Sequence, residues 1–143
     1  MNIKKINRFS TRVFNALRRL LPQLAPDSEL PDEKTFKKIL KSGSTHFFIA
    51  ELDNKEIAGI LTLVTYDIPS GHKVWIEDVV VDESQRGKGY GREMMLYAIS
   101  YAGSTGAKSI ELTSRPSRIA ANQLYRQLGF VIRETNVYRF PLE

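Results

Sequence analysis

The chain has 143 residues, 42% hydrophobic and 26% charged, a size and composition typical of one folded domain rather than of a disordered chain. It contains no cysteine, which excludes disulfide bonds, thiolate metal sites and a cysteine nucleophile, and its two histidines are too few for a zinc site built on imidazoles. The formal net charge is +5, and the excess lies at the N-terminal end, where residues 1–24 carry six basic side chains and no acidic one. We therefore expect a single domain over residues 1–143, with a basic N-terminal end and a nearly neutral remainder.

The basic N-terminal segment predicts a short strand followed by an amphipathic helix. Residues 2–7 alternate weakly between apolar and polar positions, and the helix is expected to begin at Ser10 or Thr11 and to end near Pro22 and Pro26. Its apolar residues recur at helical spacing and are Val13, Phe14, Leu17, Leu20, Leu21 and Leu24. We expect this helix to face the core with its basic side chains in solvent, so that the segment belongs to the fold. The alternatives are contact with nucleic acid or an anionic membrane, or a mitochondrial presequence.

After this helix, further helical segments flank a stretch of strand-like sequence. The predicted elements are, in chain order, a helix over 32–41, strands over 46–52, 57–66 and 74–81, a helix over 90–102, a strand over 108–113, a helix over 117–128 and a strand over 130–140. Turn clusters at 53–55 and 69–72 join the three consecutive strands, which predicts an antiparallel meander. With the first strand and helix, the order is βααβββαβαβ. The expected fold class is a single α/β domain with a mixed, mainly antiparallel central sheet and helices on both faces.

A glycine-rich basic turn, residues 86–91 (Arg-Gly-Lys-Gly-Tyr-Gly), follows the third strand of the meander and opens a helix. Glycines at alternate positions allow successive backbone N–H groups to converge on an anion, and the helix adds the positive end of its dipole. Arg86, Lys88 and Arg92 add positive charge. The turn is not a Walker loop, which requires four residues between its glycines and a Lys-Ser/Thr ending. It is not a dinucleotide fingerprint either, because Met94 stands in the place of the third glycine. It therefore predicts a phosphate site, with an ordinary solvated turn as the alternative.

Two motifs in this order resemble those of the GCN5-related N-acetyltransferases (GNATs). Residues 86–91 fit the signature Arg/Gln-x-x-Gly-x-Gly/Ala, and residues 121–130 (Ala-Asn-Gln-Leu-Tyr-Arg-Gln-Leu-Gly-Phe) resemble the second signature of that superfamily. The resemblance is close over residues 74–140, whereas residues 1–73 share only the order of elements. It implies a GNAT-like fold, acetyl-CoA as acetyl donor, and direct attack of an amine on the thioester without an acyl-enzyme or a metal.

The resemblance also implies which residues bind acetyl-CoA. The backbone of Val79, Val80 and Val81 would hold the acetyl and pantetheine groups, and the glycine-rich turn would hold the pyrophosphate. Arg118 stands where members of the superfamily often have Asn, and we expect it to reach the cofactor arm or a phosphate. The complete set of expected cofactor-binding residues is Val79, Val80, Val81, Arg86, Gly87, Lys88, Gly89, Tyr90, Gly91, Arg92 and Arg118.

Direct transfer requires a base and an acid, because a primary amine with a pKa near ~10 is protonated at neutral pH and the departing thiolate needs a proton. Tyr125, in the second signature, matches a family tyrosine near the sulfur of CoA. The resemblance implies that its phenol is the general acid. The alternative is a helix residue that packs in the core beside Ala121 and Leu128.

For the base, the sequence favours Glu77 over Asp78. In a strand of regular alternation, Glu77 shares a face with Val79 and Val81. Asp78 falls on the opposite face, so only one of the two carboxylates is expected to face the acceptor. Apolar neighbours would raise the pKa of that carboxyl and make it a better proton acceptor near neutrality. The alternatives to direct action of Glu77 are a water relay to it, Asp78 and His72.

We expect a cytoplasmic N-acetyltransferase that uses acetyl-CoA and needs no metal. The expected acceptor is a small-molecule amine, with a peptide N-terminus or a lysine side chain as the alternative, and the loops 24–32 and 66–73 are expected to determine specificity. A non-catalytic acyl-CoA-binding module and a basic nucleic-acid-binding protein are the other hypotheses. No run approaches the roughly 18 apolar residues of a membrane span, so no membrane partner is expected. An edge strand at the C-terminal end favours a homodimer.

Overall fold

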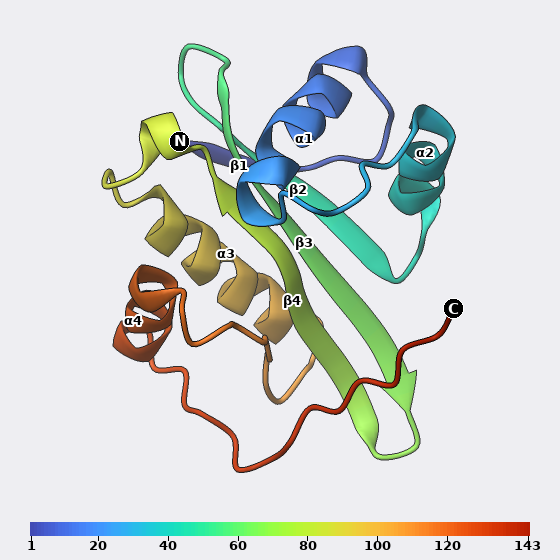
Figure 1. Cartoon of the computed structure of the whole chain (residues 1–143), viewed down its shortest axis with the longest axis vertical. Helices are drawn as coiled ribbons and strands as arrows, with labels where there is room; N and C mark the ends of the chain where they lie inside the picture. Colours follow the sequence, from blue (N-terminus) through green and yellow to red (C-terminus); the bar gives the residue numbers. More distant parts are fainter. The chain divides into compact units, whose positions relative to one another are not determined.

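The computed structural model describes residues 1–143, which divide into two compact units, Met1–Thr113 and Ser114–Glu143 (Figure 1). The first unit contains, in chain order, β1 (Asn2–Lys5), α1 (Thr11–Leu24), α2 (Glu33–Lys41), β2 (Thr45–Glu51), β3 (Ile57–Ile68), β4 (Gly71–Val81), the 3-10 helix η1 (Glu83–Gln85) and α3 (Tyr90–Ser104). The second unit contains α4 (Ile119–Gln127). No helix has both the length and the apolar composition that crossing a bilayer requires.

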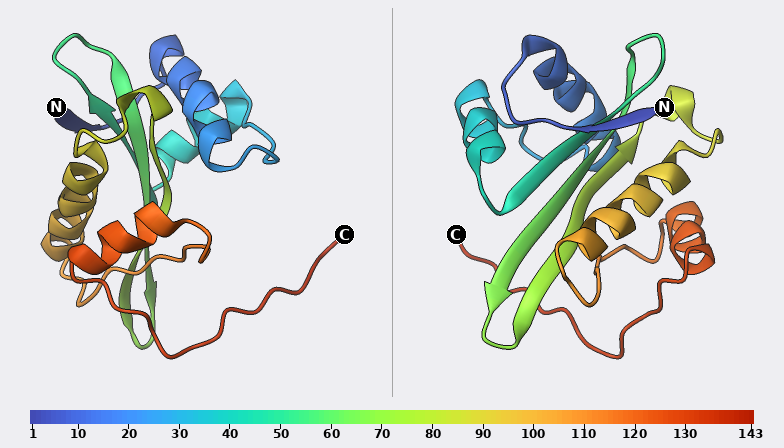
Figure 2. Two further views of the ribbon diagram at one scale, coloured as in Figure 1. Left: turned by 60° about the vertical axis from the view of Figure 1, so that its left-hand side comes forward. Right: turned by 180° about the vertical axis from the view of Figure 1, so that it is seen from behind.

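The first unit is built on one antiparallel sheet whose strands are neighbours in chain order, β1-β2-β3-β4. Helices α1 and α2 cover one face of this sheet, and α3 covers the other (Figure 2). Paired residues of neighbouring strands lie on the same face of a sheet. A contact between one of them and a helix therefore shows which face all the residues paired with it occupy. Phe48 pairs with Leu61, and the centroid of the Phe48 ring lies 5.3 Å from that of Tyr97 and 5.1 Å from that of Tyr101, both in α3. The row of Phe48 and Leu61 therefore faces α3.

The opposite face of the sheet forms a hydrophobic core with α1 and α2. The side chain of Ser10 caps α1 by accepting a hydrogen bond from the Val13 N–H over 3.2 Å, and Pro22 lies in the last turn before the helix ends. The residues of this core are Val13, Phe14, Ala16, Leu17 and Leu20 from α1, Phe36 and Leu40 from α2, and Phe47, Ile49, Ile57, Ile60 and Val80 from the sheet. The prediction of a core-facing first helix is confirmed.

The predicted fold class, α/β with a mainly antiparallel sheet and helices on both faces, is confirmed, but two predicted strands are not formed. Residues 108–113 make one isolated parallel bridge, between Glu111 and Trp75 of β4. The Glu111 carbonyl accepts a hydrogen bond from the Ile76 N–H over 2.8 Å, and the Glu111 N–H donates to the Val74 carbonyl over 3.1 Å. These bonds hold one residue against the edge of the sheet, whereas a strand needs a ladder that continues along the chain.

Residues 130–140, predicted as the last strand, form no strand either. A polar run over 133–136 interrupts the apolar alternation, and the Thr135 N–H donates to the Arg133 carbonyl over 3.0 Å, which bends the chain. The large apolar side chains on both sides of this run are exposed, namely Val131, Ile132, Val137, Tyr138 and Phe140. The expectation of a homodimer rested on an edge strand here and therefore loses its support.

In the second unit, α4 ends as the sequence predicts. Gly129 adopts a φ of 98°, a left-handed conformation that glycine accepts without strain. The Gly129 N–H donates to the Arg126 carbonyl over 3.1 Å, and the Phe130 N–H donates to the Tyr125 carbonyl over 3.0 Å. This turn brings the Phe130 ring back to the helix, 5.9 Å from the Tyr125 ring between centroids. The Gly-Phe end of the second signature thus closes the helix and packs against its tyrosine.

Candidate active site

The glycine-rich turn connects β4 to α3 in the first unit. The chain leaves β4 at Val81, passes through η1 and enters α3 at Tyr90. Gly87 and Gly89 have φ angles of 78° and 87°, a left-handed conformation that residues with a Cβ rarely adopt. A Cβ added at either glycine would meet nothing within 4 Å. The two glycines are therefore required by the path of the backbone, and the space beside them is open.

The start of α3 offers backbone N–H groups to an anion. The Glu93 N–H donates to the Gly89 carbonyl over 3.1 Å, which is the first hydrogen bond of the helix. The N–H groups of Tyr90, Gly91 and Arg92 precede it and have no partner within the helix. Together with the positive end of the helix dipole, these three groups offer a site for an anion, and the pyrophosphate as that anion stays a prediction.

Basic side chains flank the same turn. Arg86 donates from Nε to the Val81 carbonyl over 3.2 Å, and Lys88 donates from Nζ to Gln85 Oε1 over 2.8 Å. Arg86, Lys88 and Arg92 are exposed, and none of them forms an ion pair within the chain. Their positive charge is therefore available to a phosphate group.

The strand β4 contains a bulge that the sequence analysis does not predict. Leu61 of β3 pairs with Val79, whereas Leu63 pairs with Ile76, so two residues of β4 stand opposite the single residue Thr62. Leu61 and Leu63 are two positions apart in a strand and lie on the face covered by α3. Their partners Val79 and Ile76 therefore face α3 as well.

The two residues of the bulge are Glu77 and Asp78, and both face the side of the sheet covered by α1 and α2. Glu77 directly follows Ile76 and Asp78 directly precedes Val79, and successive side chains in a strand point to opposite faces. Since Ile76 and Val79 face α3, both carboxylates face the other way. The expectation that Glu77 shares a face with Val79, and that only one carboxylate lies on the acceptor face, is wrong because the extra residue reverses the alternation.

The two carboxylates of the bulge have the electrostatics of a base. Both residues are exposed to solvent, but partial desolvation raises the pKa of both carboxyls, and the neighbouring Asp78 carboxylate raises the pKa of Glu77 further. A carboxylate whose pKa is raised accepts a proton from an ammonium group more readily near neutral pH. The paired negative charge also attracts a cationic amine. The only sequence signal for this pair is that two acidic residues stand side by side in the otherwise apolar run 74–81.

His72 lies at the end of β4 far from the glycine-rich turn. Its Nδ1 lies 2.8 Å from Asp67 Oδ1, and its Nε2 lies 3.2 Å from Oγ1 of Thr105, at the C-terminal end of α3. Glu77 lies five positions after His72 along the strand, a distance of roughly 16 Å. The structure therefore does not bring His72 together with the carboxylates, and the imidazole ties the β3–β4 hairpin to α3 instead.

Tyr125 and Arg118 belong to the second unit. Burial raises the pKa of the Tyr125 phenol, while the charge of Arg118 acts to lower it, and the net effect is an increase. The phenol therefore keeps its proton at neutral pH, as a general acid must. Asn122 holds the start of α4, where its Nδ2 donates to the Arg118 carbonyl over 2.8 Å. That Tyr125 meets the carboxylates of β4 stays a prediction, because they belong to different units.

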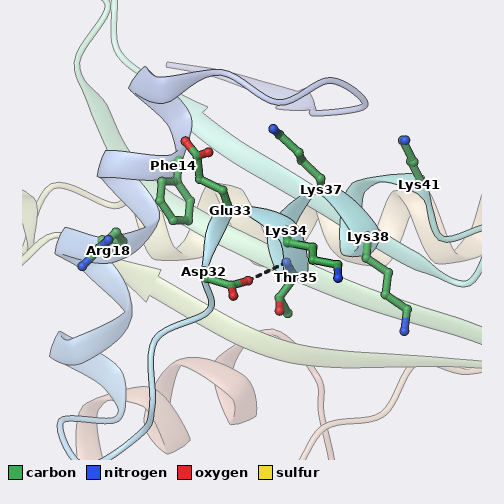
Figure 3. A pocket seen from close by; sticks show the side chains of 9 residues that line it. All are labelled: Phe14, Arg18, Asp32, Glu33, Lys34, Thr35, Lys37, Lys38 and Lys41. Atoms are coloured by element: carbon green, nitrogen blue, oxygen red, sulfur yellow. Dashed lines mark hydrogen bonds between the residues drawn. The ribbon is translucent and has the colours of Figure 1, made fainter.

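A hollow of about 1170 Å³ lies between α1 and α2 (Figure 3). Its lining includes Asp32, Glu33 and five cationic side chains, which are Arg18, Lys34, Lys37, Lys38 and Lys41. The Asp32 carboxylate is engaged in capping α2, where it accepts a hydrogen bond from the Thr35 N–H over 2.8 Å. None of the predicted catalytic or cofactor-binding residues lines this hollow, and its positive charge disfavours an ammonium group. The carboxylates of β4 are the better candidate for the acceptor site.

Comparison with known proteins shows which family this chain is similar to. The model of the acetyltransferase (GNAT) family matches residues 11–130. An uncharacterized N-acetyltransferase of Methanocaldococcus jannaschii is 28% identical over 101 residues, which are 69% of this chain and 45% of that protein. The uncharacterized N-acetyltransferase YhdJ of Bacillus subtilis is 33% identical over 89 residues, which are 62% of this chain and 61% of that protein. The chain thus matches between about half and three-fifths of the length of these two relatives.

Solved structures share the fold. An aminoglycoside acetyltransferase from an uncultured soil metagenomic sample, solved in complex with sisomicin, has a TM-score of 0.85 at 20% identity and covers 99% of this chain and 95% of its own. The aminoglycoside 6'-N-acetyltransferase of Acinetobacter haemolyticus has a TM-score of 0.78 at 18% identity and covers 100% of this chain and 99% of its own. At these identities the likeness is one of fold.

Proposed function

The chain belongs to the acetyltransferase (GNAT) family, and we propose that it transfers the acetyl group of acetyl-CoA directly to the primary amine of a small molecule. The observation that carries this proposal is the bulge of β4, which puts Glu77 and Asp78 on one face of the strand that ends in the glycine-rich turn. A phosphate-binding turn and a pair of carboxylates on the same strand suit a reaction between a nucleotide thioester and an amine.

Acetyl-CoA is proposed to bind along the outer edge of β4 and across the turn. β4 is the last strand of the sheet, and only its residues near Trp75 are bonded to residue 111, so the backbone of Val79, Val80 and Val81 has no neighbouring strand on that side. These groups are proposed to hold the acetyl and pantetheine parts. The N–H groups at the start of α3 and the charges of Arg86 and Lys88 are proposed to hold the pyrophosphate. Arg118, the residue directly before α4, is proposed as a further contact.

The proposed chemistry uses one base and one acid. Glu77, directly or through a water molecule, takes a proton from the ammonium group, and the free amine attacks the carbonyl carbon of the thioester. The new C–N bond forms, the C–S bond breaks, and the departing thiolate takes the phenolic proton of Tyr125. The nitrogen, which still carries one proton too many for a neutral amide, returns that proton to the Tyr125 phenolate directly or through water. The raised pKa values of Glu77 and Tyr125 support these opposite roles, because a raised pKa makes the Glu77 carboxylate a stronger proton acceptor and keeps the Tyr125 phenol protonated until the thiolate departs.

The paired negative charge at the bulge supports a cationic small-molecule amine as the acceptor. The names of the aminoglycoside acetyltransferases that share the fold indicate that those proteins act on cationic amines. At about 20% identity, they support a class of acceptor for this chain and no particular acceptor. We further propose that residues 1–143 act as one N-acetyltransferase domain, which the family match over 11–130 supports because it runs across both units. A cytoplasmic location stays a prediction.

The proposal is tested by incubating the protein with acetyl-CoA and a panel of primary amines and by following the products by mass spectrometry. The panel contains polyamines, amino sugars, aminoglycosides, a peptide with a free N-terminus and a lysine peptide. An acetylated small molecule that is not formed by the Glu77→Gln, Asp78→Asn double variant supports the proposal. Acetylated peptides alone would overturn the acceptor class, and binding of acetyl-CoA without any product would indicate a non-catalytic acyl-CoA-binding module.

A further inference from the structure

The helix α1 contacts the chain at the point where it leaves β4 for the glycine-rich turn. Arg19 of α1 forms an ion pair through Nη1 with the carboxylate of Asp82, and its Nη2 donates to the Ile57 carbonyl over 2.8 Å. One helical turn further on, Gln23 Oε1 accepts a hydrogen bond from the Glu83 N–H over 2.8 Å. Two side chains of one helix therefore hold two consecutive residues ahead of the turn.

Asp82 is the residue through which this contact reaches the turn. It is only 6% exposed, and its Oδ1 accepts hydrogen bonds from both the N–H and the Oγ of Ser84 over 3.1 Å each. Its carbonyl accepts a hydrogen bond from the Gln85 N–H over 2.8 Å, and its own N–H donates to the Ala58 carbonyl over 2.8 Å. Asp82 thus joins the sheet to η1, and η1 leads directly into the turn.

We propose that Arg19 and Asp82 are positioning residues for acetyl-CoA, which fix the glycine-rich turn in the conformation that binds the pyrophosphate. This inference rests on the proposed function, since it assigns the turn to that ligand. A buried carboxylate without its cation keeps the cost of desolvation and loses the attraction, so removal of Arg19 frees Asp82 to leave its place. Because the N–H groups at the start of α3 must converge on one anion, a small displacement of the turn weakens binding.

A simple electrostatic effect makes a different prediction. If Arg19 only added positive potential near a phosphate, then Arg19→Gln would weaken acetyl-CoA binding and Asp82→Asn, which removes a negative charge, would strengthen it. Positioning requires both variants to weaken binding. The variant that carries both substitutions should bind acetyl-CoA no more weakly than the weaker-binding of the two single variants, because both substitutions break the same interaction.

The chain offers a matched control on the same helix. Arg12 of α1 donates from Nη2 to Oε2 of Glu51 over 2.7 Å, and Glu51 is 5% exposed, so this is also an ion pair between α1 and a buried carboxylate. Glu51 is the last residue of β2, and its ion-pair partners are Lys4, Arg12 and Lys55, none of which belongs to η1 or the glycine-rich turn. Arg12→Gln should therefore lower the melting temperature as Arg19→Gln does without changing the affinity for acetyl-CoA.

The test measures the Kd of acetyl-CoA by isothermal titration calorimetry for the intact chain and for Arg19→Gln, Asp82→Asn and Arg12→Gln. We expect the first two variants to raise the Kd about tenfold and the third to leave it within about twofold. In turnover, the KM for acetyl-CoA should rise in the first two variants while the KM for the amine stays the same. Arg19→Lys keeps the ion pair, and Gln23→Ala removes one hydrogen bond, so both are milder variants. Each should raise the Kd of acetyl-CoA about threefold, and they replace Arg19→Gln and Asp82→Asn in the test if those variants do not fold.

Several results would overturn the inference. These are an unchanged Kd in Arg19→Gln, a lower Kd in Asp82→Asn, and an equal loss of affinity in Arg12→Gln, which would indicate a general effect of destabilisation. Failure of the unaltered protein to bind acetyl-CoA would overturn the proposed function and this inference together. An unaltered protein that binds acetyl-CoA, with Arg19 and Asp82 variants that bind it equally well, would overturn this inference alone.

Discussion

Replacing Gly59 with alanine tests how tightly β3, β4 and α3 are packed behind the proposed acetyl-CoA site. A Cβ on Gly59 would lie 2.8 Å from the Val80 carbonyl oxygen, 2.9 Å from Met94 Sδ and 3.1 Å from Met94 Cε. The carbonyl belongs to the backbone of β4, and Met94 is 1% exposed, so neither neighbour has free space to move into. The added methyl group therefore pushes β3 away from β4 and from the first turns of α3.

The expected size of the effect follows from these contacts. Overpacking of a closed core costs about 1–3 kcal/mol, and the loss of unfolded-state entropy on changing glycine to alanine offsets about 0.4–1 kcal/mol of this. A net destabilisation of about 1–2 kcal/mol should lower the melting temperature by about 3 to 8 °C in a domain of this size. Because Val80 and α3 flank the turn, the affinity for acetyl-CoA should fall as well.

Thermal unfolding followed by circular dichroism measures the change, and Gly43→Ala is the control. A Cβ at Gly43 would meet nothing within 4 Å, so that variant should unfold within about 1 °C of the unaltered protein or slightly above it. A melting temperature of Gly59→Ala equal to that of Gly43→Ala would refute the packing of α3 against β3 and β4 described above.

Three further predictions concern the acid, the turn and a buried carboxylate. Tyr125→Phe removes only a hydroxyl, so kcat should fall by about 10²-fold while the Kd of acetyl-CoA stays within about twofold, and a loss of binding instead would indicate a packing role. Acetyl-CoA at ~100 times its Kd should raise the melting temperature by roughly 5 to 10 °C. Gly89→Val should reduce this shift, because Gly89 has a φ of 87°, and Gly103→Ala, at a position without such a φ, should keep it. Hydrogen bonds from cationic partners lower the pKa of Glu51 from 4.5 to about 2. The hydrogen bond from Lys4 has the largest effect, and that from Arg12 the next largest. Its stabilising effect is therefore full above about pH 4.5 and is lost as the pH falls toward 2, so Glu51→Gln should lower the melting temperature at pH 7 and much less at pH 2.5, and an equal decrease at both would contradict this assignment.

The parts of the fold that local sequence patterns determine could be predicted. Helical spacing of apolar residues, the Ser10 cap and the closing glycine of α4 all act within a few residues, and the structure shows these elements where the sequence puts them. The glycine-rich turn is predictable for the same reason, because the alternate glycines and basic residues that suit an anion lie within six consecutive positions. Its left-handed glycines confirm that the backbone path depends on them.

The parts that depend on pairing over long distances could not be predicted. The bulge at Glu77 arises because β3 supplies one residue where β4 supplies two, and nothing in the sequence of β4 alone shows this. Strands over 108–113 and 130–140 were expected from composition, but a strand exists only where a partner bonds to it. The ion pair between Arg19 and Asp82 joins residues that are far apart in the chain, and in the sequence Arg19 was only one of six basic residues in an acid-free segment.

The central claim is that the carboxylate pair of β4 accepts the proton of the amine, and the pH dependence of kcat/KM for the amine tests it most directly. Because the pKa of Glu77 is raised, kcat/KM should begin to fall with decreasing pH above the ordinary range of a glutamate, by about tenfold for each pH unit below that pKa. Glu77→Gln should remove this limb. Asp78→Asn should keep it but move it to lower pH, because the neighbouring negative charge that raises the pKa of Glu77 is gone. An unchanged limb in both variants would show that neither carboxylate is the base and would contradict the account.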